Sequence, residues 1–421
     1  MKYFLLIFLL LQSLFSFSQL QISTLDIHTN DLVYDSNTNR IYVSIPSSNG
    51  SNGNSIGIIN PATSELEKTI FIGSEPTVLA ISDNGEYIYS GFSGASLIRR
   101  FVVATQTSGL QFSLGTDSSS GSYYAEDIEV MPNNPTTIAV SRKNITASPR
   151  HEGVAIYDND QLRSITTPDH SGSNKIEFDS QNSLIGYNNE TSEFGIRKHA
   201  INNSGVTTTS ITQSVLSGFG VDFIYQGSNN SNQKSNTSRI YSDNGKVIDT
   251  SNTPFVIGSF SNINGPVAYD TQNDLVCFAN YESGVINFKR FNPNTFLLFD
   301  SLTVSQTTEE ANSLITCGNN CYAFNTNDNK VVIIKDASLG ITSANVNKNI
   351  SISPNPVIDY ITIKNSELLN EISILDTSGR LVFNKFNSLN KIYLGNLSSG
   401  IYFVKSKYIN NTISTKKIIV K

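Results

Sequence analysis

Residues 75–89 read EPTVLAISDNGEYIY, which is an apolar strand, a polar turn containing Gly85, and a second apolar strand. The same two-strand pattern returns along most of the chain. The first strand of each copy ends at residue 35, 82, 131, 179, 225, 270 or 316, so that neighbouring copies lie 45 to 49 residues apart. A repeat of this length built from short β-strands is typical of a β-propeller, and seven copies predict seven blades.

Most copies continue into two further apolar strands, as in residues 55–60 and 67–72. The last copy is shorter, with strands only at 311–317, 321–325 and 330–336. A spare strand at residues 20–27 precedes the first copy. We therefore predict a propeller over residues 19–339 that is closed by strand 20–27, because closure pairs the last blade with the first and leaves no open sheet edge.

The composition agrees with an all-β fold. The 421 residues are 38% hydrophobic and 15% charged, contain no Trp, and are rich in β-branched, aromatic and turn-forming residues. Residues 20–349 carry nineteen Lys and Arg against thirty-one Asp and Glu, a net charge of −12, whereas residues 350–421 carry nine against four, a net of +5. An acidic main domain repels a polyphosphate chain, so nucleic acid is excluded as a partner.

Residues 75–89 resemble the repeats of the YVTN and lactonase-like propellers in the form P-x-x-(apolar)-A-(apolar)-S-x-(D/N)-G-x-x-(apolar)-Y. The other copies keep this pattern loosely. The resemblance implies the propeller fold and leaves the activity open, because one fold hosts many functions.

The N-terminus has the features of a signal peptide. Lys2 precedes an uninterrupted apolar run at residues 4–11, and Ser16 and Ser18 provide a small-x-small cleavage site. We predict that residues 1–18 are removed and that the exported protein begins near Gln19. No later apolar run has the length of a transmembrane helix, so no transmembrane segment is expected.

The end of the chain differs from the repeats. A polar stretch at residues 340–349 is predicted to be a linker. Beyond it, alternating strands separated by D-T-S-G and S-S-G turns predict a small Ig-like β-sandwich over residues 350–421. The complete fold expected from the sequence is therefore all-β, with a seven-bladed β-propeller followed by this sandwich.

Four segments of residues 350–421 resemble the type A C-terminal sorting domain of cargo proteins of the type IX secretion system. The residues that carry the resemblance are Pro354, Asn355, Pro356, Asp376, Gly379, Gly400, Tyr402 and Lys405, followed by a lysine-rich apolar end. The resemblance implies recognition by the type IX machinery, export across the outer membrane to the cell surface or beyond, and removal of the domain within the linker. The alternative is an ordinary Ig-like accessory domain.

Three cysteines are present. Cys277 lies within an apolar strand, where a buried free thiol is expected. Cys317 and Cys321 flank a tight turn, so that they either form a disulfide in an oxidising compartment or remain free thiols.

The sequence contains few patterns that are typical of catalytic or metal-binding residues. The four histidines His28, His151, His170 and His199 stand in different parts of the repeat and have no metal-ligand spacing. Nucleophile-elbow and nucleotide-loop motifs are absent. We therefore assign no catalytic residue and expect neither a metal nor a cofactor.

A ligand site is expected at the mouth of the channel, on the face that carries the long, basic loop at residues 141–153, since long loops on a rigid scaffold often carry function. The candidate residues are Tyr123, Tyr124, Glu126, Asp127, Arg142, Lys143, Arg150, His151, Asp169 and His170. The cations would attract an anionic ligand and the tyrosines would add flat apolar area for a sugar. In the structural alternative, the cations pair with neighbouring carboxylates. An insertion at residues 227–238 is expected to decorate the opposite face.

Three functions remain open. The favoured hypothesis is a non-enzymatic binding module for an unknown surface ligand or glycan. An enzyme, such as a lactonase-like hydrolase or a glycan lyase, would have Arg150 with His151 and Asp169 with His170 as its only candidate pairs at the channel mouth. A structural adhesin is the third.

Overall fold

The computed structural model describes residues 20–118, 121–170, 172–226, 238–336, 351–364, 366, 369–386, 390–408 and 413–421. The chain divides into two compact units, Met1–Ala337 and Ser338–Lys421. The predicted signal peptide at 1–18, the predicted linker at 340–349 and nearly all of the insertion at 227–238 lie outside the described residues.

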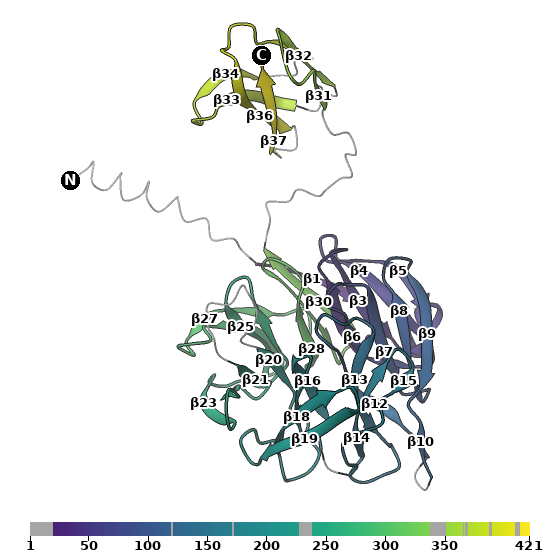
Figure 1. Ribbon diagram of the computed structural model, residues 1–421. Helices are drawn as coiled ribbons and strands as arrows, with labels where there is room; N and C mark the ends of the chain where they lie inside the picture. Colours follow the sequence, from purple (N-terminus) through teal and green to yellow (C-terminus); the bar gives the residue numbers. More distant parts are fainter. Residues whose placement is uncertain are drawn as a thin grey trace, which may run out of the picture. The chain divides into compact units, whose positions relative to one another are not determined.

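The first unit consists mainly of seven four-stranded antiparallel sheets (Figure 1). The first three are β2 (Leu32–Asp35), β3 (Arg40–Ile45), β4 (Ser55–Asn60), β5 (Glu65–Phe71); β6 (Pro76–Ile81), β7 (Tyr87–Phe92), β8 (Leu97–Val102), β9 (Thr107–Ser113); and β12 (Tyr124–Val130), β13 (Thr137–Lys143), β14 (His151–Asp158), β15 (Gln161–Leu162). The next three are β16 (Lys175–Ser180), β17 (Ser183–Tyr187), β18 (Ile196–Asn202), β19 (Gly205–Thr212); β20 (Phe223–Gln226), β21 (Arg239–Ser242), β22 (Lys246–Asp249), β23 (Phe255–Ser259); and β24 (Val267–Asp270), β25 (Leu275–Glu282), β26 (Val285–Phe291), β27 (Leu298–Val304).

The seventh sheet joins the two ends of this unit. It contains β28 (Ala311–Thr316), β29 (Cys321–Thr326), β30 (Lys330–Asp336) and, as its outer strand, β1 (Leu20–Asp26). β1 pairs with β30 along its whole length, from Leu20 opposite Asp336 to Asp26 opposite Lys330, and Figure 1 shows the two strands side by side. Two small elements lie outside the sheets, the 3-10 helix Ser47–Asn52 and the hairpin of β10 (Thr116–Asp117) and β11 (Gly121–Ser122).

Apolar clusters fill the spaces between neighbouring sheets. Among the described residues there are seven such clusters in this unit, one for each neighbouring pair of sheets. The cluster that joins the seventh sheet to the first contains Ile41 and Val43 together with Ala323 and Ile333, all of them fully buried. The ring is therefore closed by packing as well as by strand pairing, and the prediction of an all-β, seven-bladed propeller is confirmed.

The second unit is a small β-sandwich. One sheet contains β31 (Ser351–Ser353), β32 (Tyr360–Lys364) and β35 (Lys391–Tyr393), and the other contains β33 (Leu369–Asp376), β34 (Leu381–Phe386), β36 (Gly400–Tyr408) and β37 (Ile413–Val420). Buried residues from both sheets, among them Ile361, Ile374 and Val404, form its core. The predicted Ig-like sandwich is thus also confirmed.

Candidate functional site

A cavity of about 620 Å³ lies where the innermost strands of the seven sheets begin. Every sheet contributes lining residues, so the cavity occupies the channel at the centre of the ring. Among the described residues, its charged lining consists of Asp31, Asp127, Glu129, Glu177, Asp222, Asp243, Glu310 and a single cation, Lys175. We call this space the acidic cavity. Its volume is in the range that accommodates small-molecule ligands.

Several of these charged residues occupy equivalent positions in the repeat. Asp31, Asp127, Lys175 and Asp222 each stand immediately before a buried apolar residue of an innermost strand. The carboxylate of Asp127 accepts hydrogen bonds from the N–H of Ile128 (3.0 Å) and, in the next sheet, from the N–H of Ile176.

Asp31 repeats this arrangement. Its carboxylate accepts from the N–H of Leu32 in its own sheet and from the N–H of Leu79 in the second sheet, both at 2.8 Å. The same aspartates therefore line the acidic cavity and tie neighbouring sheets together.

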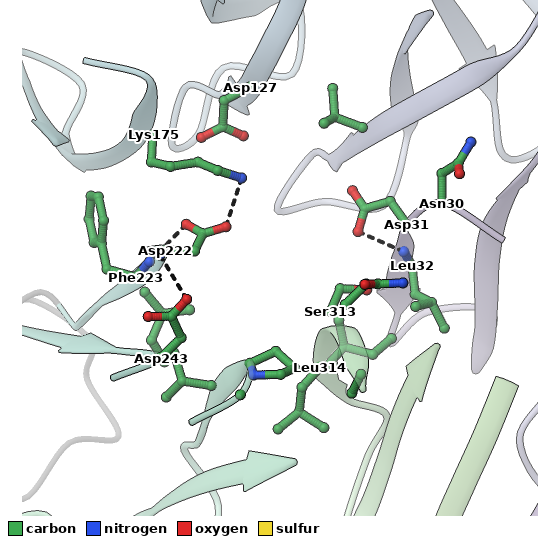
Figure 2. A pocket seen from close by; sticks show the side chains of 18 of the residues that line it. Asn30, Asp31, Leu32, Asp127, Lys175, Asp222, Phe223, Asp243, Ser313 and Leu314 are labelled. Atoms are coloured by element: carbon green, nitrogen blue, oxygen red, sulfur yellow. Dashed lines mark hydrogen bonds and ion pairs between the residues drawn. The ribbon is translucent and has the colours of Figure 1, made fainter. Parts of the chain in front are cut away.

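The carboxylates converge on Lys175. Its ammonium lies 2.7 Å from the carboxylate of Asp222, and the N–H of Asp222 in turn donates to Asp243 at 2.9 Å. Figure 2 shows Asp127, Lys175, Asp222 and Asp243 on one side of the cavity and Asp31 on the opposite side. One lysine faces seven carboxyl groups, so the cavity carries an excess of negative potential.

Burial in the acidic cavity shifts the pKa values of its carboxyl groups. Burial raises the pKa of Asp31 to about 6, and it raises those of Asp127 and Asp243 to about 7. Burial and the neighbouring carboxylates raise the pKa values of Glu129 and Glu177 well above their ordinary range. Near neutral pH the cavity therefore holds both protonated and ionised carboxyl groups, and a cation that enters favours the ionised ones.

Burial opposes the charge of Lys175. The carboxylates of Asp222 and Asp127 outweigh that cost, so the pKa of this ammonium lies well above its ordinary value. Lys175 consequently remains charged, and its ammonium shows how these carboxylates hold a cation.

Of the ten candidate residues from the sequence, Asp127 is the one that lines the acidic cavity. The predicted cations Lys143, Arg150 and Arg142 each have a partner nearby. Lys143 pairs with Glu126 at 2.7 Å, and Arg150 pairs with Glu190 from the fourth sheet at 2.8 Å.

The guanidinium of Arg142 is buried and lies 4.9 Å from the centre of the Tyr123 ring. Tyr124, the first residue of β12, pairs with Lys143 on β13, so these residues stand at the same end of the sheets as the acidic cavity. Asp169 and His170 are exposed and lie 3.7 Å apart.

His151 is not exposed at the channel mouth. Its ring is 1% exposed, and neither ring nitrogen has a hydrogen-bond partner. Burial, followed by the charge of Arg197, lowers its pKa to about 3. A neutral, enclosed imidazole of this kind belongs to the packing between the third and fourth sheets.

Sequence reasoning missed Asp31, Glu129, Lys175, Glu177, Asp222 and Asp243 as cavity residues. The available signal was positional, because a charged residue directly precedes a buried apolar residue of the innermost strand in four of the seven repeats.

Cys317 and Cys321 form a disulfide across the turn between β28 and β29, with their Cα atoms 4.8 Å apart. Cys277 is a buried free thiol, and burial raises its pKa well above the ordinary value.

In the second unit, the sorting-motif residues hold turns and edges. The side-chain amide of Asn355, between Pro354 and Pro356, donates to the carbonyl of Lys417 at 3.1 Å and accepts from the N–H of Ile419 at 2.9 Å. The opening segment is thereby fixed along the outer strand β37.

Asp376 accepts from the N–H groups of Ser378 and Arg380, both at 3.0 Å, in a turn where Gly379 adopts a φ of +84°. Tyr402 donates to the carbonyl of Ser398 at 3.0 Å. Gly400 begins β36, and Lys405 on the same strand is exposed.

The comparisons with known proteins agree with both units. Residues 351–421 match the family model of the secretion system C-terminal sorting domain. Among the described residues, no helix has the length and apolar character needed to cross a membrane. The second unit is therefore a type IX sorting domain, and the protein is exported to the cell surface or released from it.

Solved structures similar to this chain are propellers. The β-propeller domain of Cps50 (Swd1) from Myceliophteria thermophila has a TM-score of 0.58 and 9% identity, over 75% of this chain and 99% of that chain. Hydrazine synthase from Kuenenia stuttgartiensis has a TM-score of 0.53 and 12% identity, over 74% of this chain and 97% of that one. At such identities the likeness shows the fold alone. No curated protein matches the sequence.

Proposed function

We propose that the exported propeller is a binding module whose acidic cavity takes a small organic cation. The observation that carries this proposal is the arrangement around Lys175, where an ammonium group is held among carboxylates inside a cavity that has room for more. A ligand ammonium placed beside Glu129 and Glu177 would meet carboxyl groups that form no ion pair with any residue the structure describes, in surroundings where charge interactions are stronger than in water.

The shape of the site favours an organic cation over a metal ion. Within the part of the chain that the structure describes, no three His, Cys, Asp or Glu side chains converge closely enough to ligate a metal. The carboxylates are instead distributed around a wide space, and several of them are occupied by backbone N–H groups. An alkylammonium fits this arrangement, because its single charge needs few contacts and its body fills volume.

The direct test is calorimetric titration of the exported protein with butylamine at a pH of about 8, where butylamine is charged and Asp31, Asp127 and Asp243 are mostly ionised. We expect a dissociation constant on the order of 1 mM or below for this small ligand and no binding of the neutral analogue butanol. The double variant Glu129→Gln/Glu177→Gln should bind about tenfold more weakly. Lys175→Met removes the resident cation and should strengthen binding.

Asp169→Asn is the matched control, because it removes a carboxylate that is exposed and lies outside the acidic cavity. Its affinity for butylamine should equal that of the unmodified protein. Equal binding by the double variant, a preference for Ca²⁺ over butylamine, or no binding of butylamine at all would contradict the proposal.

A further inference from the structure

A second cavity, of about 410 Å³, lies at the other end of the innermost strands. Its lining is apolar and aromatic, with Tyr34, Tyr225 and Tyr269 from the first, fifth and sixth sheets and Val33 and Ile81 beside them. We call it the tyrosine cavity. The two ends of the channel are thus chemically opposite.

The two cavities adjoin. Ile224, Val267, Leu314 and Ile315 line both the acidic cavity and the tyrosine cavity. We call these four apolar residues, which come from the fifth, sixth and seventh sheets, the collar. Asp222, which immediately precedes β20, and Tyr225 within β20 are three residues apart along the chain, which corresponds to roughly 10 Å at the usual rise per residue of a strand.

The tyrosines present their rings to this space. Each hydroxyl is already engaged by a neighbouring side chain: Tyr34 donates to Asn39 at 2.8 Å, Tyr225 to Asp179 at 2.5 Å and Tyr269 to Asp274 at 2.5 Å. Aromatic rings whose polar ends are satisfied elsewhere offer flat apolar surface to a ligand.

One polar group in the tyrosine cavity lacks a partner. Gln226 is 3% exposed, and its side-chain oxygen accepts a hydrogen bond from Tyr241 at 2.6 Å. Its side-chain nitrogen is buried and has no hydrogen-bond partner. A buried donor left unmatched costs free energy.

Resting on the proposed function, we infer that the ligand is an amphipathic cation, held by its ammonium group in the acidic cavity and by an apolar or aromatic body that passes the collar into the tyrosine cavity. The charge gradient along the channel fixes the orientation of such a ligand. Neither end alone gives this selectivity, because an acidic site accepts any cation and an apolar pocket accepts any apolar body of suitable size.

The experiment compares three probes on the exported protein: butylamine, phenylbutylamine and phenylbutanol. Phenylbutylamine should bind at least about tenfold more tightly than butylamine, because its ring becomes buried among apolar side chains. It should also bind more tightly than phenylbutanol, which has the same ring and no charge.

The variant Tyr34→Ala tests whether the ring of the probe binds in the tyrosine cavity. Tyr34 lies at the rim of the tyrosine cavity and its hydroxyl contact is exposed, so the fold should tolerate the change. Tyr34→Ala should reduce the advantage of phenylbutylamine over butylamine about fivefold and leave butylamine unchanged. Tyr34→Phe is the matched control and should retain the full advantage.

The outcomes separate the two proposals. If butylamine binds and phenylbutylamine binds no more tightly, or if Tyr34→Ala leaves its advantage intact, the extended ligand is wrong while the cation site stands. If neither amine binds, both proposals are wrong.

Discussion

Asp127, within β12 of the third sheet, accepts a hydrogen bond of 2.9 Å from the backbone N–H of Ile176 in the fourth sheet. Because the other carboxylate oxygen accepts from Ile128, this one side chain satisfies two N–H groups from two sheets. The same residue supplies negative charge to the acidic cavity. Stability and ligand recognition are therefore linked at this position.

Replacing Asp127 tests the structural part of that link. Asp127→Ala leaves two backbone N–H groups without their acceptor, and we expect the free energy of unfolding to fall by about 2 kcal/mol. Asp127→Asn retains one acceptor oxygen and should cost less. Denaturant unfolding measures both. Asp169→Ala, at an exposed carboxylate, should stay within about 0.5 kcal/mol of the unmodified protein, and an equally small effect of Asp127→Ala would argue against the link between sheets.

Closure of the ring predicts a second effect. A chain that begins at Ile27 lacks β1, so the hydrogen-bonding edge of β30 becomes exposed. We expect a lower melting temperature and self-association through the open edge. Thermal unfolding and light scattering measure these properties. Gln21→Ala, an exposed position within β1, is the control. A truncated chain that melts like the full one and stays monomeric would show that β1 is dispensable.

The enclosed histidines predict acid sensitivity. The folded pKa of His151, about 3, lies below its unfolded value of 6.5, so the unfolded chain binds the proton more readily. The contribution of His151 to stability is therefore lost as pH falls below about 6.5, by up to about 1.4 kcal/mol per pH unit. In His151→Leu this contribution is missing.

Unfolding free energies at pH values of about 7.5 and 4.5 test this point. The unmodified protein should lose more stability than His151→Leu over this interval. Comparing the two proteins at each pH cancels the opposite effect of Asp31, Asp127 and Asp243, whose raised pKa values favour the folded state as pH falls. Equal losses would show that the imidazole is not confined in its neutral form.

The sorting domain gives a fourth prediction. Asn355→Ala removes both hydrogen bonds that hold the opening segment along β37, and we expect a less stable domain and reduced export. Asn384→Ala, at an exposed position on β34, is the matched control. The fraction of the protein recovered outside the cell measures export. Normal export of Asn355→Ala would mean that the machinery does not need this segment fixed.

The fold was predictable because its signals are local. In the propeller, the residues within each repeat indicate its strands and turns. In the sorting domain, the turn around Asp376 is held by contacts within four residues. The site was harder to predict. Arg150 reads as an unpaired cation along the sequence, and its partner Glu190 lies forty residues away in another sheet.

Alternation along the innermost strands gives no sign of the channel. In the segment Ile128-Glu129-Val130 the polar residue appears to face bulk solvent, as in an ordinary half-buried strand. In a closed ring that face lines the channel, so Glu129 and Glu177 meet other carboxyl groups instead of open water. Only the three-dimensional closure reveals this.

The most direct test of the cation site is the affinity of the exported protein for butylamine as a function of pH. Since Asp127 and Asp243 have pKa values of about 7 and a bound ammonium favours their ionised forms, binding should release protons and the affinity should rise between about pH 6 and pH 8. Calorimetry in two buffers of different ionisation enthalpy counts the released protons. An affinity that is flat or falls over this range, with no proton released, would contradict binding among the channel carboxylates.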